Sequence, residues 1–282
     1  MDNKEELKKI ILEKVRNEIQ LDVQSSNDSV TVTSSKIGGK PSVPEGFVWP
    51  TYHADYLEKD EPLAFLAQFN LEELAPYDKD GLFPKKGMLS FFYCLLEDDL
   101  LWGTDPRDKG SARVFYFEDA TCLKPIDFPE GAYEGGKITE KAVMFKAHDS
   151  YPTFDFLYDL CGGFDSDLYH ECLTELGYIN DCLYNDKLLG YAEYVQHSEE
   201  AICEKMYLGF DATNPPGQVI TDEDKKAFVE GSVNWVQLFQ LDPENESFDE
   251  MMCIDGFIHF FIRKEDLKNF NFDDIQYIVE CG

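Results

Sequence analysis

Residues 65–70 read FLAQFN, and in this stretch Gln68 lies among apolar neighbours whose pattern predicts a buried strand. A second stretch, LFQLD at residues 238–242, repeats the pattern with Gln240 in the corresponding place. Strand composition alone does not require a glutamine there. We expect each buried amide to need hydrogen-bond partners and to tie the sheet to a loop. The alternative is that Gln68 and Gln240 contact a ligand.

Two further pairs of segments recur in the same order. KIGGKP from Lys36 is echoed by KLLGYA from Lys187, and GMLSFFY from Gly87 is echoed by GFIHFFI from Gly256. The three pairs are separated by 151, 172 and 169 residues, so one insertion in the second half, within residues 199–231, aligns them. An internal duplication is our expectation, and chance similarity of apolar strands is the alternative.

Helical spacing of apolar residues predicts a helix at the start of the chain and another between the two halves. The first is predicted over residues 1–22 from Leu7, Ile10, Ile11, Val15 and Ile19, and the second over 168–183 from Leu168, Cys172, Leu176, Ile179 and Leu183. Thr221 and Asp224 have the spacing of a capping box, which predicts a third helix. DSVTVTSSKIGG at 28–39 predicts a strand ending in a turn, and FDDIQYIVECG at 272–282 predicts a final strand.

These elements predict an α+β protein that is mainly β and consists of two related sheet units. We expect an N-terminal helix over 1–22, a first sheet unit over 23–150 and a second unit with helical insertions over 151–282. The two units are expected to pack as one compact domain.

Several segments, taken together, resemble the YwqG-like family, which is domain of unknown function family 1963. They are SKIGGKPSVPEG, PLAFLAQFNLEEL, FPKKGMLSFFY, ARVFY, LLGYAEYVQ, LFQLD and DGFIHFFIRKEDLKNFNFD, in this order over residues 36–282. The resemblance implies a mainly β, roll-like fold with antiparallel sheets and internal duplication, in a bacterial cytosolic protein. It implies no catalytic residues. Where the second copy in such proteins usually has two glycines, this chain has Leu189 and Gly190.

The glycine- and proline-rich stretch at residues 35–50 could be a phosphate-binding loop or a turn. A phosphate-binding loop leads into a helix whose N-terminal amides hold the phosphates. Here Gly38-Gly39-Lys40 is followed by Pro41, which removes an amide donor and disfavours helical geometry at Lys40. We therefore expect a tight turn and an extended loop that lays Phe47 and Trp49 on the sheet.

Charge limits the classes of partner. With 25 basic and 56 acidic residues the formal net charge is −31, so nucleic acid and anionic membranes are poor partners. The acidic excess either keeps the protein soluble or steers a basic protein towards it. No signal peptide or long apolar segment is apparent, and the eight cysteines lack the close pairs of a zinc knuckle, so we expect a cytoplasmic protein with reduced thiols. Oligomeric state is left open.

The recognised catalytic and metal-binding motifs are absent from the sequence, which favours a non-catalytic protein without deciding the question. YDKDG at 77–81 contains two aspartates and a glycine, as a calcium-binding loop does, but its spacing fits a turn better. No cofactor and no metal are therefore expected.

Two hypotheses from different classes remain. The first is an acidic binding module for a basic partner protein, in the manner of an immunity protein that neutralises a cationic toxin. The second is a small-molecule-binding protein or enzyme with a pocket between the two units. The candidate pocket residues are Trp49, Gln68, Trp102, Arg113, Trp235 and Gln240.

Overall fold

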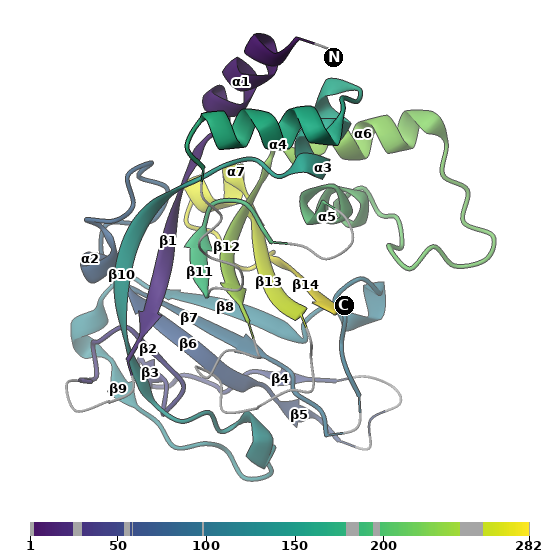
Figure 1. Cartoon of the computed structure of the whole chain (residues 1–282). Helices are drawn as coiled ribbons and strands as arrows, with labels where there is room; N and C mark the ends of the chain where they lie inside the picture. Colours follow the sequence, from purple (N-terminus) through teal and green to yellow (C-terminus); the bar gives the residue numbers. More distant parts are fainter. Residues whose placement is uncertain are drawn as a thin grey trace.

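Ten of the strands form one antiparallel sheet rather than two separate sheets (Figure 1). The computed structural model describes residues 3–24, 30–53, 57, 59–97, 99–178, 186–193, 198–242 and 256–281. The strand order is β14-β13-β12-β11-β1-β10-β2-β6-β7-β8. The strands are β1 (Arg16–Val23), β2 (Lys36–Ile37), β6 (Ala64–Asn70), β7 (Met88–Tyr93), β8 (Ala112–Phe117), β10 (Lys141–Ser150), β11 (Lys187–Leu189), β12 (Trp235–Leu241), β13 (Gly256–Arg263) and β14 (Gln276–Cys281).

Two short strand pairs and the helices cover the outside of this sheet. The pairs are β3 (Ser42–Val43) with β9 (Lys124–Pro125) and β4 (Thr51–Tyr52) with β5 (Glu61–Pro62). The helices are α1 (Lys4–Glu13), α2 (Leu71–Leu74), α3 (Phe154–Cys161), α4 (Ser166–Glu175), α5 (Glu199–Tyr207), α6 (Asp222–Ser232) and α7 (Lys264–Lys268). In Figure 1, α1, α3, α4 and α6 lie together beyond one end of the strands, and α5 lies beside β13 and β14.

The sheet curls until its two edges approach each other. The segment between β7 and β8 makes this connection, because the carbonyl of Trp102 accepts a hydrogen bond from the backbone N–H of Val279 on β14 at 2.9 Å. The hydroxyls of Ser111 and Tyr277 lie 2.6 Å apart, and the rings of Tyr93 and Tyr277 pack edge to face. The large sheet is therefore a nearly closed, barrel-like structure.

Phenylalanines from both halves of the chain fill the interior of the barrel. The ring of Phe239 lies 5.3 Å from that of Phe69 and 5.0 Å from that of Phe91, and Phe91 also contacts Phe260 at 5.3 Å. We call β2, β6, β7 and β8 the first arm of the sheet and β11, β12, β13 and β14 the second arm. The aromatic contacts join the two arms in one core. The outer faces of the same strands are buried as well, because loops and helices cover them, so polar side chains on those faces need partners inside the protein.

Both glutamines meet this need in the same way. Gln68 accepts a hydrogen bond from the backbone N–H of Ser42 at 2.9 Å and donates to the carbonyls of Val32 and Ser34. Gln240 accepts from the backbone N–H of Glu193 at 2.9 Å. Both amides are fully buried. The prediction that each glutamine ties the sheet to a covering segment is confirmed.

The predicted N-terminal helix over 1–22 is wrong beyond Glu13. Residues Arg16–Val23 form β1, which pairs with β10 on one side and β11 on the other. Helical spacing continues to Ile19 by coincidence, and hydrogen bonding to two strands outweighs it because Ile19 and Leu21 also alternate as a strand requires.

The strand predicted over 28–39 is also largely wrong. Only Lys36 and Ile37 are paired as a strand, while residues 32–34 turn and residues 25–29 lie outside the described residues. Ser34 donates its backbone N–H to the carbonyl of Thr31, closing this turn. The β-branched residues of this segment favour a strand, but its carbonyls accept hydrogen bonds from the Gln68 side chain instead of from a neighbouring strand.

Other predictions from the sequence are confirmed. Helix α4 begins after Asp165, whose carboxylate accepts from the backbone amides of Asp167 and Leu168. It ends at Glu175, so the predicted extension towards 183 is wrong at Gly177, which has a φ of 76°, while Ile179 and Leu183 lie outside the described residues. The Thr221–Asp224 capping box opens α6, and β14 is the final strand. Gly38 and Gly39 form a left-handed turn with φ values of 61° and 69°, followed by β3 rather than a helix.

The loop after that turn also behaves as expected. The rings of Phe47 and Trp49 both pack on Phe92 of β7. The geometry of a phosphate-binding loop is thus missing from residues 35–50, all of which the structure describes.

We predict that Gln68→Leu lowers the free energy of unfolding by about 2–4 kcal/mol, because it leaves buried N–H and carbonyl groups of the 32–42 segment without partners. Urea denaturation measures this. The matched control, Gln276→Leu at a half-buried position on β14, should change stability by less than about 0.5 kcal/mol. Equal effects of the two substitutions would contradict the proposed role of Gln68.

Candidate functional site

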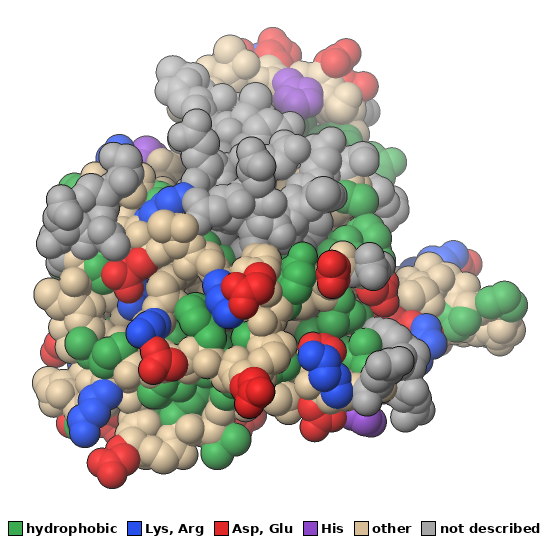
Figure 2. All heavy atoms as spheres, turned by 90° about the horizontal axis from the view of Figure 1, so that it is seen from below, with side chains coloured by type: hydrophobic (Ala, Val, Ile, Leu, Met, Phe, Trp, Pro, Cys, Tyr) green, Lys and Arg blue, Asp and Glu red, His purple; other side chains and the backbone are tan. Residues whose placement is uncertain are grey.

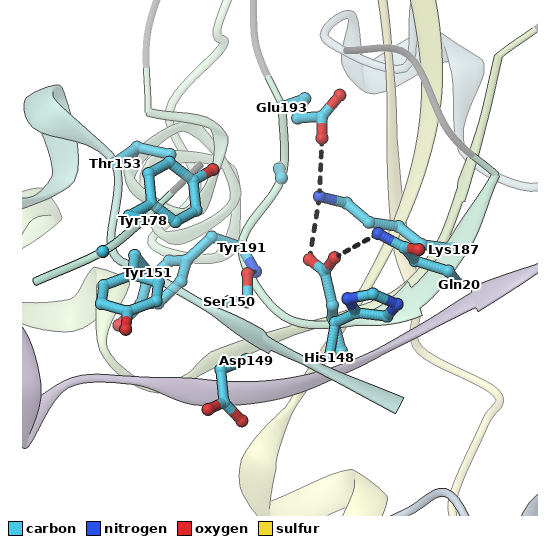
Figure 3. Close-up of a pocket in the computed structure, with 13 residues that line it drawn as sticks. Gln20, His148, Asp149, Ser150, Tyr151, Thr153, Tyr178, Lys187, Tyr191 and Glu193 are labelled. Carbon is cyan, nitrogen blue, oxygen red and sulfur yellow. Dashed lines mark hydrogen bonds and ion pairs between the residues drawn. The ribbon is translucent and has the colours of Figure 1, made fainter. Parts of the chain in front are cut away.

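A cavity of about 270 Å³ lies where β1, the end of β10 and β11 meet the segments around α3 and α4 (Figure 3). Its walls are mostly polar and aromatic: Glu18, Gln20, His148, Asp149, Ser150, Tyr151, Thr153, Gly177, Tyr178, Lys187, Tyr191, Ala192 and Glu193. This volume is near the lower end of ligand sites, so the cavity has room for a small molecule or for one long side chain.

A buried ion-pair cluster forms one wall. The Nζ of Lys187 lies 3.3 Å from Glu18 and 3.1 Å from Glu193, and the side chain of Lys187 is only 4% exposed. Gln20 donates to the other oxygen of Glu18, as the dashed lines in Figure 3 show. Burial alone would lower the pKa of Lys187, but the Glu18 and Glu193 carboxylates outweigh it and raise that pKa above 10.5. Lys187 is therefore charged in the folded protein.

Strand pairing and an unusual turn position these side chains. Gln20 and Lys187 are directly opposite each other on β1 and β11, so their side chains share a face of the sheet. After Lys187 the chain turns through Leu189 and Gly190, with φ values of 61° and 78°. Leu189 is one of three described non-glycine residues with positive φ. The turn brings Glu193 back over Lys187.

Tyrosines form the opposite wall of the cavity. The rings of Tyr151 and Tyr178 lie 4.9 Å apart and stand across from Lys187 and Glu193 in Figure 3. Thr153 lies beside them, and its buried Oγ1 has no hydrogen-bond partner among the described residues. Aromatic faces attract cations, and an unpartnered hydroxyl is available to a polar ligand.

The floor of the cavity is rigid. Ser150 accepts a hydrogen bond from the backbone N–H of Tyr191 at 3.0 Å, and the Tyr191 hydroxyl donates to the carbonyl of Lys14. The guanidinium of Arg16 stacks on the Tyr191 ring at 3.8 Å. These contacts fix Ser150 and Tyr191, which form the floor of the cavity, without a bound ligand.

The charges around the cavity do not cancel. Glu18 and Glu193 carry two formal negative charges against the one positive charge of Lys187, while Asp149 is paired with Lys79 at 3.5 Å. With the two tyrosines, this excess favours a ligand that carries a positive charge and a hydrogen-bond donor.

The six residues proposed from the sequence do not line this cavity. Gln68 and Gln240 hold covering segments, as described above. Trp49 and Trp235 are packed with their indole N–H groups donated to Leu63 and Glu204. Trp102 is 41% exposed in the segment that closes the barrel, and Arg113 is exposed on the edge strand β8.

Sequence reasoning missed the residues that do line the cavity. Lys187 offered a signal, because a lysine at the start of an apolar strand recurs at Lys36 in the first half. The side chain of Lys36 is also buried and lies 2.7 Å from Glu140. The position of Glu18 on a strand could not be predicted, because the apolar spacing over residues 1–22 indicates a helix.

Comparison with protein-family models matches residues 35–281 to DUF1963, a domain of unknown function. The chain belongs to this family. The resemblance read from the sequence is thus confirmed over most of the chain. A comparison with curated proteins found no match. Among the described residues, no helix is long and apolar enough to cross a membrane.

We predict that Lys187→Met lowers the free energy of unfolding by about 3–5 kcal/mol at neutral pH, because Glu18 is then left in a buried site without its cation. Adding Glu18→Gln should restore part of the loss. Because the pKa of Lys187 is raised on folding, the stabilisation is complete below pH 10.5 and is lost as the pH rises through the folded value.

Denaturant titrations of the wild type and of Lys187→Met, from neutral pH to above pH 10.5, measure the difference in their free energies of unfolding. It should shrink above pH 10.5, and a difference that grows with pH would contradict the ion-pair assignment.

Proposed function

We propose that the protein is a non-catalytic, acidic binding module for a basic partner protein, and that the cavity beside Lys187 receives an arginine or lysine side chain of that partner. The observation that carries this proposal is the cavity itself, with its excess of carboxylates facing two tyrosines. A guanidinium could stack on Tyr151 or Tyr178 and bond to Glu193. The volume of about 270 Å³ suits one such side chain.

The net charge of −31 supports the same class of partner, since it speeds the approach of a basic protein. On the face seen in Figure 2, acidic and basic side chains are interspersed among hydrophobic ones. Long-range attraction therefore comes from the whole molecule, and a specific site has to supply the direction of binding. The cavity is such a site.

A protein that binds a cationic toxin, in the manner of an immunity protein, would have these properties. We place this function in the cytoplasm, since the described cysteines are free thiols, as is usual in reducing compartments. Nucleic acid has no part in the proposal, because the charge has the wrong sign.

A second candidate function is the binding of a free small molecule in the same cavity. The Oγ1 of Thr153 favours it, because this buried hydroxyl at the cavity wall has no partner among the described residues and a small polar ligand would supply one. The two candidates share the recognition of a cationic group and differ in whether a polypeptide carries it.

We also infer that the scaffold arose by internal duplication, as the resemblance implied. Lys36 pairs with Gln68 across β2 and β6, and Lys187 pairs with Gln240 across β11 and β12. The hydrogen bonds from Ser42 to Gln68 and from Glu193 to Gln240 follow the same separations of 151 and 172 residues.

Two irregularities in the sheet support the same inference. The bulge between Phe65 and Ala67 on β6 recurs between Gln237 and Phe239 on β12, again 172 residues apart. Bulges are specific features that do not recur at matched positions by composition alone. In this arrangement β1 of the first copy corresponds to β10 of the second copy. The two strands are exchanged between the copies, because β1 pairs with β11 of the second copy and β10 pairs with β2 of the first.

The binding proposal predicts that an acetylated, amidated Gly-Arg-Gly peptide binds, and that the same peptide with citrulline in place of arginine does not. Calorimetry or chemical-shift titration measures both. The affinity should fall as salt is raised, because charges outside the cavity are screened. Equal binding of the two peptides would contradict the proposal.

Substitutions locate the site. Glu193→Gln should weaken arginine-peptide binding about fivefold, as expected for loss of one partly exposed charge pair of about 1 kcal/mol. Glu118→Gln, which removes an exposed charge just after β8, should leave binding unchanged. Agmatine carries the guanidinium without a peptide backbone, so binding of agmatine but not of the peptide would favour the small-molecule candidate.

A further inference from the structure

Helix α5 carries three buried glutamates, and two of them have a guanidinium partner. Glu200 lies 3.6 Å from Arg16, and Glu204 lies 2.7 Å from Arg263 and also accepts from the indole of Trp235. Glu199 is fully buried, and neither of its carboxylate oxygens has a standard hydrogen-bond partner among the described residues. A carboxylate in such a place needs a proton or a cation.

Among the described residues, the basic group that approaches Glu199 is the imidazole of His259 on β13. Its Nε2 lies 3.8 Å from a Glu199 oxygen and has no hydrogen-bond partner within the described part of the chain. Burial and, to a smaller extent, the nearby charge of Lys187 together lower the pKa of His259 to about 3, so the ring is neutral. His259 therefore cannot act as the cation that Glu199 lacks.

The other nitrogen of His259 shows which tautomer is present. Gln237 donates its amide to the carbonyl of Leu189, which leaves the Gln237 carbonyl oxygen to face Nδ1 of His259 at 3.3 Å. Nδ1 must then carry the hydrogen, and Nε2 presents a lone pair towards Glu199. A histidine held through one nitrogen by an acceptor and open at the other is the usual arrangement of a metal ligand.

Glu280 on β14 completes the group. One ligand atom from each of Glu199, His259 and Glu280 lies within 4.8 Å of the others, and all three residues are buried. Zinc binds histidine nitrogen and carboxylate oxygen at about 2.0–2.2 Å, so donors around one ion lie closer together, and a small inward movement of the side chains suffices. A divalent ion would also balance the two carboxylates.

We propose that Glu199, His259 and Glu280 form a binding site for a divalent transition-metal cation such as Zn²⁺. The site supplies one imidazole nitrogen and two carboxylate oxygens, a donor set that suits Zn²⁺ better than Mg²⁺ or Ca²⁺. Gln237 positions His259 and is not itself a ligand. The inference does not depend on the proposed binding of a basic partner.

The site belongs to the second half of the chain only. His259 occupies the place that Ser90 has in the first half, since each lies opposite the buried glutamine of its own arm. The β12 bulge turns Gln237 to the same face as His259. Helix α5, which carries Glu199, lies in the region between β11 and β12 where the sequence comparison placed an insertion.

The competing explanation is a proton shared between the carboxylates. Burial raises the pKa of Glu199 well above its usual value, and Glu280 raises it further. The experiment therefore has to distinguish bound metal from bound proton.

Chelator-treated full-length protein is titrated with Zn²⁺ by calorimetry, and with Co²⁺ by visible absorption. We expect one tight site, a Co²⁺ spectrum of a nitrogen- and oxygen-ligated ion, and a higher unfolding temperature with Zn²⁺. Glu199→Gln and His259→Gln should each weaken Zn²⁺ binding about 100-fold.

Surface controls exclude adventitious binding, because the protein has many exposed acids. His53→Gln and Glu171→Gln replace exposed residues and should leave the tight site unchanged. Glu199→Gln removes a buried charge while keeping the shape, so its metal-free form should unfold at the wild-type temperature or above. The proposal is overturned if wild type binds Zn²⁺ no more tightly than Glu199→Gln, or if the surface controls abolish the tight site.

Discussion

The rest of the structure depends on one hydrogen bond, made twice, between a buried glutamine amide and the backbone of a covering segment. Gln68 holds Ser42, and Gln240 holds Glu193, each at 2.9 Å. Because the strands that carry these glutamines are buried on both faces, the covering segments cannot leave without exposing unpaired polar groups. The second of these bonds fixes the backbone of Glu193, and so it sets the carboxylate of Glu193 beside Lys187 at the cavity.

The two proposed sites lie where the two arms of the sheet differ. In the first arm the lysine is Lys36, which bonds to Glu140 and to the carbonyl of Lys40. In the second arm Lys187 instead faces a cavity lined by tyrosines. The position opposite the glutamine is a serine in one arm and a histidine in the other. On the duplication proposed above, one copy keeps the structure while the other acquires the proposed binding groups.

Sequence patterns predicted the family, the mainly β fold, the glutamine contacts, and helices α4 and α6, because these depend on local periodicity and caps. They did not predict β1, since its apolar residues satisfy both helical and strand spacing and only pairing with β10 and β11 decides between them. The candidate sites were missed for a related reason. Glu18 and Lys187 are far apart in the chain and meet because β1 and β11 are neighbours in the sheet. Glu199 and His259 meet where helix α5 lies against β13.

Amide hydrogen exchange, resolved by residue with NMR, tests the central claim most directly. The backbone N–H groups of Ser42 and Glu193 lie in covering segments rather than in the large sheet, yet both donate to a buried glutamine. The account predicts that these two amides exchange nearly as slowly as those of the core strands, because opening them requires global unfolding. Exchange at the rate of exposed loop amides would contradict it, since the covering segments would then open independently of the sheet.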